Sequence, residues 1–199
     1  MTGYATLGFM YAPAVFVDES KARGYLLVAV FVNSADLPRT RKHVNTLRLP
    51  RQRRLHFTTA SKPHRKAILR GLAESGVSAT MYDASAYCTE KAARNAAMSR
   101  MVDDAARVGA TLLIVERDDS TLVADRIIIQ DCLRRAGCQD TLRYEHLRAH
   151  EECLLALPDA IAWCWARGGE WRHRVKFLVT EVVTMRPGEH PEPNRPTIR

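Results

Sequence analysis

The sequence predicts an α/β fold in which a mixed central sheet opens with a β-hairpin and is flanked by helices. Two apolar, valine-rich segments, residues 14–19 and 25–32, are joined by a short polar link, which is typical of a hairpin. Strand-like and helical patterns then alternate, as expected of a sheet covered by helices. The length of 199 residues suits one domain, which we expect to span residues 1–185. Residues 186–199 contain four prolines and are predicted to form a disordered tail.

The remaining elements follow from hydrophobic periodicity and from helix start and stop signals. Residues 38–49 have the pattern of a basic helix, and Leu55-His56-Phe57 is a candidate for a short strand. A second helix begins near Ser61, and a strand spans residues 77–82. The second half is predicted to contain a helix over 89–109, a strand over 111–115, a helix over 122–136, a strand over 142–147, a helix over 153–166 and an amphipathic segment over 171–185.

The net charge of +8 is concentrated in one segment. Between Asp36 and Glu74 there are eleven basic residues and no acidic one, so this segment carries +11 and the rest of the chain carries −3. Because phosphate contacts dominate the affinity of proteins for nucleic acids, this segment predicts a nucleic-acid-binding surface. The alternative is a solvated basic face that binds nothing in particular. The candidate phosphate contacts are Arg39, Arg41, Lys42, Arg51, Arg53, Arg54, Arg65 and Lys66.

The composition excludes several classes of protein. Hydrophobic residues make up 46% and charged residues 26%, which rules out wholesale disorder. No apolar run approaches the roughly 20 residues of a membrane-spanning helix. The N-terminus has no positive charge before its apolar stretch, so no secretory signal is expected. The five cysteines have no CxxC spacing, which argues against a zinc ribbon or a disulfide framework and favours the cytoplasm.

Two carboxylates follow buried strands. Asp18 ends the first apolar strand and Glu116 follows Thr-Leu-Leu-Ile-Val, and α/β folds commonly bind ligands at such strand ends. Glu19 must point to the opposite face of its strand from Asp18. The plain alternative for Asp18 is a turn residue that bonds the backbone of Ser20 or Lys21.

Two further acids lie in apolar helical patterns. Asp125 falls inside the apolar stripe of its helix, so it either pairs with Arg126 or another arginine or lines a site. Asp159 is the only charged residue between Cys153 and Ala166, where burial is costly unless the carboxylate is paired or binds a metal. Its alternative is an anion in the first turn of a helix that begins at Pro158. Three or four converging carboxylates are the usual ligands of Mg²⁺.

The histidines and tryptophans give weaker signals. His56 is a candidate general base or phosphate contact, and its alternative is a strand residue with a satisfied hydrogen bond. His146 and His150 have helical i, i+4 spacing, but the strand pattern there argues against a metal pair. The three tryptophans are expected in the core.

Several blocks of the sequence resemble the domain-of-unknown-function family 3800, in which a DES motif opens the chain and a helix with the pattern (I/L)-(A/P)-D-x-(I/V)-A closes it. The matching blocks are Val-Phe-Val-Asp-Glu-Ser at 15–20, the valine-rich strand after it, Leu-His-Phe at 55–57, Val-Glu-Arg at 115–117 and Leu-Pro-Asp-Ala-Ile-Ala at 157–162. The resemblance covers residues 14–167 and implies a ribonuclease H-like fold. Lys21 departs from the common DESG motif.

The resemblance implies that Asp18, Glu116 and Asp159 match the acidic residues of a ribonuclease H-like or resolvase-like metal site. Asp125 and Glu145 are possible supplementary members of that site. The leading interpretation is therefore a cytoplasmic nuclease that uses Mg²⁺ or Mn²⁺, with His56 at the scissile phosphate.

Two alternatives stay open: a non-catalytic nucleic-acid-binding or interaction module of the same fold, and a small-molecule phosphohydrolase. The sequence does not distinguish DNA, RNA or hybrid substrates. No membrane partner is expected, and Tyr4, Phe9 and Tyr11 are candidates for a contact patch in a homo-oligomer.

Overall fold

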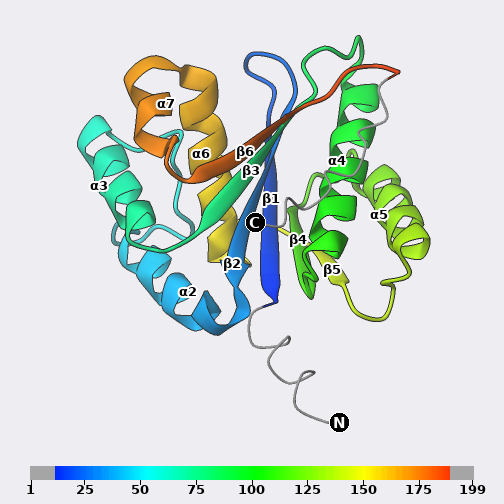
Figure 1. Ribbon diagram of the computed structural model, residues 1–199. Helices are drawn as coiled ribbons and strands as arrows, with labels where there is room; N and C mark the ends of the chain where they lie inside the picture. The colour runs from blue at the N-terminus through cyan, green and yellow to red at the C-terminus, as the bar shows by residue number, and fades with distance from the viewer. Residues whose placement is uncertain (1–11, 189–199) are drawn as a thin grey trace, which may run out of the picture.

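The two valine-rich segments form the predicted hairpin at the centre of the sheet. In the computed structural model, which describes residues 12–188, β1 (Pro13–Ser20) pairs antiparallel with β2 (Leu26–Asn33) (Figure 1). The described residues form a six-stranded sheet in the order β5-β4-β1-β2-β3-β6. β3 (Ser78–Asp83) is antiparallel to β2. The other three strands extend the sheet in parallel pairs: β4 (Leu112–Glu116) beside β1, β5 (Arg143–Leu147) beside β4, and β6 (Val179–Thr184) beside β3.

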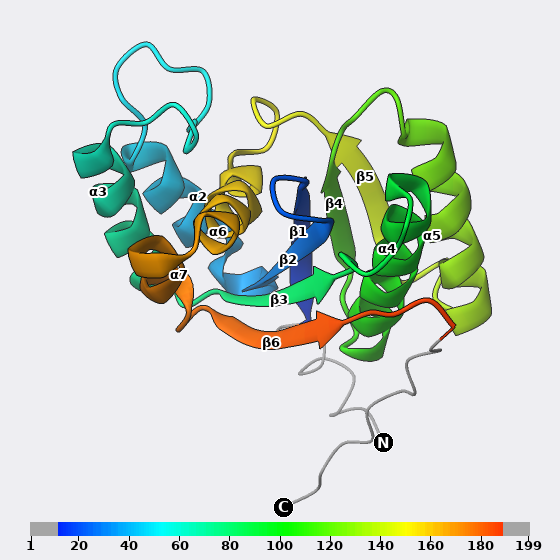
Figure 2. The same ribbon diagram turned by 90° about the horizontal axis from the view of Figure 1, so that it is seen from above.

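Helices cover both faces of this mixed sheet, as Figure 2 shows. One face is covered by α4 (Glu90–Arg107) and α5 (Leu122–Ala136). The other face is covered by α2 (Leu37–Thr46), α3 (Lys62–Ala73), α6 (Ala156–Arg167) and α7 (Gly169–Val175). Short 3₁₀ turns at Ser34–Asp36 and Cys153–Leu155 precede α2 and α6.

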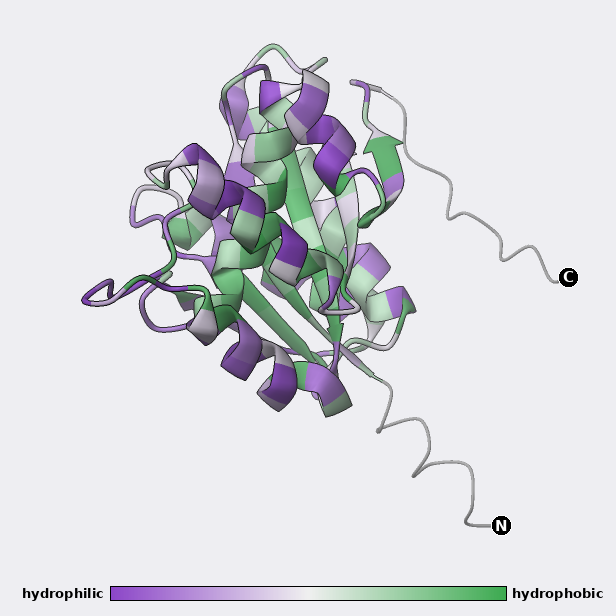
Figure 3. Ribbon diagram, turned by 90° about the vertical axis from the view of Figure 1, so that its left-hand side faces the viewer, coloured by the Kyte–Doolittle hydropathy of each residue, from purple (hydrophilic) through white to green (hydrophobic). Residues whose placement is uncertain are grey.

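Two hydrophobic cores lie on the two faces of the sheet. Along β1, Ala14 and Phe16 pack in the core beside α6, whereas Val15 and Val17 pack in the core beside α4 and α5. Because both faces are buried, the central strands are apolar in nearly continuous runs. In Figure 3 these strands are mainly green, and the helices alternate between green and purple. The alternation determines which face each residue at the end of β1 must reach.

The structure differs from the predicted elements in two places. Leu55-His56-Phe57 is not a strand but part of the loop that joins α2 to α3. Leu55 and Phe57 are buried all the same, and the Phe57 ring packs edge-on against Trp163 with 5.4 Å between centroids. The segment predicted as one amphipathic element over 171–185 is divided between α7 and β6, because its second half is rich in β-branched residues, which favour a strand.

Some predictions fall on parts of the chain without a described structure. Tyr4, Phe9 and Tyr11 lie outside the described residues, as does the predicted tail after residue 188. All five cysteines are free thiols. Within residues 12–188, no helix is both long and apolar enough to cross a membrane.

Candidate carboxylate site

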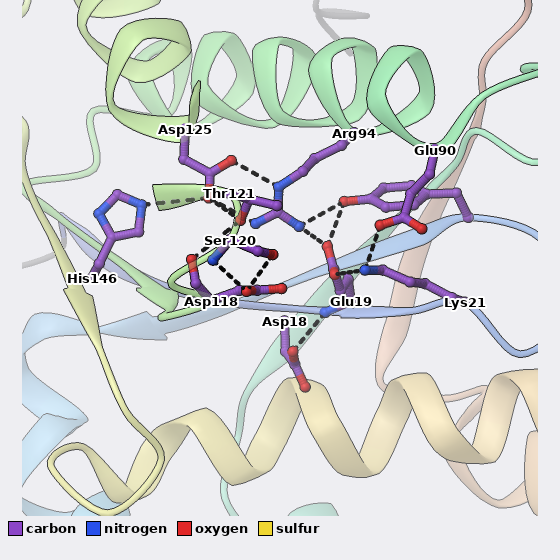
Figure 4. A network of polar contacts seen from close by, with 11 residues as sticks. Asp18, Glu19, Lys21, Glu90, Arg94, Asp118, Ser120, Thr121, Asp125 and His146 are labelled. Carbon is purple, nitrogen blue, oxygen red and sulfur yellow. Dashed lines mark hydrogen bonds and ion pairs between the residues drawn. The ribbon is translucent and has the colours of Figure 1, made fainter. Parts of the chain in front are cut away.

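Asp18 and Glu116 lie side by side at the ends of two adjacent parallel strands. Val17 of β1 pairs with Val115 of β4, so the next residue of each strand stands on the same face. That face is the one covered by α6, on which Asp159 lies. In Figure 4 the Asp18 carboxylate points towards α6, away from Glu19. The backbone N–H of Glu19 donates to Asp18 Oδ1 at 2.7 Å, a different partner from the Ser20 or Lys21 of the turn alternative.

The three acids share an environment that disfavours their charged forms. Burial raises the pKa of Asp18 well above its ordinary value, and the nearby charges of Glu116 and Asp159 raise it further. Burial and the charge of Asp159 also raise the pKa of Glu116, against the opposing effect of Arg54. Burial raises the pKa of Asp159, which the Phe57 backbone, Arg54 and His56 partly oppose. The site therefore favours a shared proton or a cation.

The chemistry of these donors fits a hard divalent cation, but the ligands are not gathered around one point. Carboxylate oxygens are the preferred ligands of Mg²⁺ and Mn²⁺. Within residues 12–188, however, no three His, Cys, Asp or Glu side chains are arranged to hold a metal ion. Asp18 and Glu116 lie close enough for each to shift the pKa of the other, and Arg54 Nη1 lies 3.6 Å from Glu116 Oε1. Metal binding would have to separate that ion pair.

Asp125 lies apart from this group, on the other face of the sheet. Its carboxylate is fully buried and accepts two hydrogen bonds of 2.7 Å, from Nε and Nη2 of Arg94. Burial alone would raise the pKa of Asp125, but hydrogen bonds from Arg94 and Thr121 and the nearby His146 side chain lower it to about 2. Asp125 is therefore engaged by an arginine and lies apart from the other predicted metal ligands. The structure agrees with the alternative that Asp125 pairs with an arginine, and that arginine is Arg94 rather than Arg126.

Arg94 also connects Asp125 to Glu19, the residue after Asp18 at the end of β1 (Figure 4). Its Nη1 contacts Glu19 Oε2, which also accepts a hydrogen bond of 2.6 Å from the Tyr25 hydroxyl. Lys21 Nζ lies 2.9 Å from the other oxygen of Glu19. Sequence periodicity missed Arg94, because a pairing across 31 residues of chain leaves no local pattern.

Glu145 is also separate from the three acids. It lies on β5, opposite Ile114 and so short of the strand end, and it pairs with Arg143. We therefore leave it out of the candidate site.

The loop between α2 and α3 brings two basic side chains to the carboxylates. Arg54 Nε donates a hydrogen bond of 2.7 Å to His56 Nε2, and the same guanidinium contacts Glu116. Arg54 and His56 both lower the pKa of Asp159, so their charges act on the third acid as well. His56 is thus a loop residue beside the acidic group rather than a strand residue.

Some of the predicted phosphate contacts are engaged by other residues of the fold, and others are accessible at the surface. Arg41 forms a forked pair with Glu152 at 2.7–3.2 Å. Arg65 donates to the Phe57 carbonyl at 2.9 Å and stacks 4.2 Å from the centroid of Trp163. These two arginines are therefore engaged by partners within the fold.

The other predicted contacts are more accessible. Arg39 and Lys66 pair at the surface with Asp36 and Glu170. Three of the predicted contacts are exposed and form no ion pair with residues 12–188, namely Lys42, Arg51 and Arg53. They are the side chains most readily available to an anion.

His146 and His150 are separated, as the strand pattern predicted. His146 is buried on β5 with Nε2 3.7 Å from Asp125 Oδ2. His150 is exposed and lines a cavity of about 280 Å³ with Gln52, Arg53, Arg54 and His56. The sequence contains no signal for this grouping, because His150 comes from a loop about a hundred residues further along the chain.

Comparison with known proteins supports the fold. No family model and no curated protein matches this sequence. Among solved structures, the chain is similar to ribonuclease HII in the PCNA:RNase HII complex from Archaeoglobus fulgidus, with a TM-score of 0.52 and 15% identity over 83% of this chain and 78% of that one. At this identity the likeness concerns the fold alone. It supports the predicted mixed α/β fold, similar to that of a ribonuclease H-like protein.

Proposed function

We propose that this protein is a metal-dependent nuclease that hydrolyses phosphodiester bonds of nucleic acid. The observation that carries the proposal is that Asp18, Glu116 and Asp159 are half-buried acids with raised pKa values on one face of the sheet, near enough for Asp159 to raise the pKa of the other two. Structural ion pairs bring acids and bases together, as at Asp125, whereas this group brings three acids together with Arg54 paired to one of them. Such an arrangement is typical of a site that works with a cation bound.

Asp18, Glu116 and Asp159 would hold Mg²⁺ or Mn²⁺, which supplies an activated water and stabilises the leaving oxygen. Arg54, once released from Glu116, can contact the scissile phosphate. Because arginine only donates, His56 Nε2 must be the acceptor of their hydrogen bond, so the proton of neutral His56 lies on Nδ1. We assign the His56 Nδ1–H a hydrogen bond to an oxygen of the scissile phosphate.

A second candidate is a non-catalytic nucleic-acid-binding module. The ion pair between Arg54 and Glu116 favours it, since a guanidinium at that position already partly neutralises the acidic group. Both candidates use the basic segment 39–70, and they differ in whether a metal binds.

The deciding experiment is a screen of divalent metals against labelled single-stranded, duplex and hybrid oligonucleotides. We expect cleavage with Mg²⁺ or Mn²⁺, and its loss in Asp18→Asn. Asp131→Asn is the matched control, because Asp131 is an exposed acid on α5 that pairs with Arg134. Binding without cleavage under every metal would favour the non-catalytic module. Cleavage of small phosphate esters but not of oligonucleotides would favour a small-molecule phosphohydrolase.

A further inference from the structure

Two loops far apart in sequence form a small basic cavity next to the acidic group. The loop over residues 47–61 joins α2 to α3, and the loop over residues 148–152 follows β5; both rise on the same side of the molecule in Figure 2. The cavity has a volume of about 280 Å³. Its lining residues, which we call the basic pocket, are Gln52, Arg53, Arg54, His56 and His150.

The lining contains hydrogen-bond donors and cationic or protonatable groups, and no acid. Arg53 and Arg54 supply guanidinium groups, the two histidines supply imidazoles, and Gln52 supplies an amide. The acid next in sequence, Glu151, is engaged elsewhere, since its Oε2 accepts the Arg148 backbone N–H at 2.7 Å. Such a lining recognises an anion with several acceptor oxygens, and a phosphate group is one that guanidinium groups bind through paired hydrogen bonds.

The backbone around the pocket is held in place before any ligand arrives. Arg48 Nη1 donates to the Arg53 carbonyl at 3.2 Å, and the Leu49 N–H donates to Gln52 Oε1 at 3.2 Å. Arg51 has a φ of 68°, a left-handed conformation that costs energy in a residue with a side chain and persists only where its surroundings enforce it. At the far end of the loop, Arg65 holds the Phe57 carbonyl. The Arg53 side chain thus projects from a fixed backbone.

Arg54 connects the pocket to the carboxylates. It lines the pocket, and the same guanidinium lies 3.6 Å from Glu116 and bonds His56. A phosphate in the pocket and a phosphate at the carboxylates would therefore lie on either side of one arginine side chain, which suits neighbouring phosphates of one strand.

We propose that the basic pocket binds the backbone phosphate adjacent to the scissile one. This inference rests on the proposed nuclease function and adds a requirement to it: a substrate must extend at least one phosphate beyond the cut. A mononucleotide ester would leave the pocket empty. His150 becomes a binding residue that no sequence pattern indicated.

The test uses the double variant Arg53→Gln/His150→Gln in the full chain. Both side chains are exposed, so the fold should persist. The control is Arg126→Gln/His173→Gln, which makes the same chemical change at exposed positions on α5 and α7 that lie outside the pocket lining. The probe is a fluorescent single strand of roughly 12 nucleotides, a typical length for single-strand sites. Anisotropy in EDTA measures binding without cleavage, and circular dichroism checks the fold of each variant.

We expect the pocket variant to bind roughly tenfold more weakly than the parent, as when a charged hydrogen bond is removed. The slope of log K against log salt should flatten by about one unit, as expected when one phosphate is no longer bound. The control should match the parent. A scan that replaces one phosphate at a time by an uncharged methylphosphonate should find a position that weakens the parent and leaves the pocket variant unaffected.

Cleavage of the same strand by the parent in Mg²⁺ separates the two proposals. If the parent cleaves and the pocket variant binds like the control, the pocket assignment is wrong and the nuclease proposal stands. If the parent binds and does not cleave, while the variant loses affinity and its coupling to a single phosphate, the pocket binds phosphate and the hydrolytic function is wrong. If the parent binds no oligonucleotide, both are overturned.

Discussion

Replacing Asp125 with asparagine should destabilise the protein, because this acid is fully buried and paired with Arg94 through two hydrogen bonds of 2.7 Å. The pairing lowers the pKa of Asp125 from 3.8 to about 2. Each tenfold change in proton affinity is worth about 1.4 kcal/mol, so the charged pair contributes about 2.5 kcal/mol at neutral pH. Leaving a buried charge without any partner costs about 3–5 kcal/mol, but Arg94 would keep Glu19. We therefore expect a loss of about 2.5 kcal/mol, or roughly 5–10 °C in Tm.

The pH dependence of this loss has a definite sign. A lowered pKa in the folded state means that the stabilisation is present above pH 3.8 and disappears as the pH falls through about 2. The parent and Asp125→Asn should therefore differ most at neutral pH and converge in acid. Urea unfolding at several pH values measures the difference.

Asp159→Asn is the matched comparison and should behave in the opposite way. The pKa of Asp159 is raised by burial, so its charged form opposes folding as the pH rises. An uncharged asparagine relieves that effect, and the metal-free variant should be at least as stable as the parent. Equal stability of Asp125→Asn and the parent, or an equal loss in both variants, would refute the division of these acids into a paired and an unpaired group.

Four further outcomes are expected from the same side chains. Mg²⁺ should raise the Tm of the parent and not that of Asp18→Asn, as scanning fluorimetry would show, because a ligand stabilises only the state that binds it. Replacing Arg51, Arg53 and Arg54 together by alanine should flatten the salt dependence of oligonucleotide binding by roughly one unit for each phosphate that is no longer neutralised. Arg65→Ala should instead lower the free energy of unfolding, since its guanidinium holds a carbonyl and stacks on a tryptophan, with little change in the salt slope. Thiol titration under denaturing, non-reducing conditions should count five free cysteines, and a lower count would contradict the cysteine assignment.

The fold was predictable from the sequence wherever both faces of an element were buried. Alternating residues of β1 and β4 had to reach opposite cores, which placed Asp18 and Glu116 on one face and Glu19 on the other. β6 was not predictable in the same way, since this strand at the sheet edge exposes Val182, so its pattern shows no clear period. Edge strands bury less, and the pattern weakens accordingly.

The candidate site was predictable in its acids and much less in its basic residues. A carboxylate at the end of a buried strand is visible in the sequence, because the strand fixes its position. Whether an arginine is free or held depends on partners far along the chain, such as Glu152 for Arg41 and Trp163 for Arg65. Charge counting treated all eleven basic residues of the segment alike, and only tertiary contacts separate them.

The two faces at the end of β1 depend on each other. The Glu19 backbone N–H orients Asp18, and the Glu19 side chain is held by Arg94, Tyr25 and Lys21. The network of hydrogen bonds and ion pairs on the α4 face thus fixes the backbone that presents an acid to the α6 face. The surroundings of Asp18 disfavour its charged form, as its raised pKa shows, so they do not hold its carboxylate in place. Its position has to be set by neighbouring residues that already have their own hydrogen-bond and ion-pair partners. This is why the paired acids Glu19 and Asp125, although they do not belong to the carboxylate site, are expected to be as necessary to it as the acids that do.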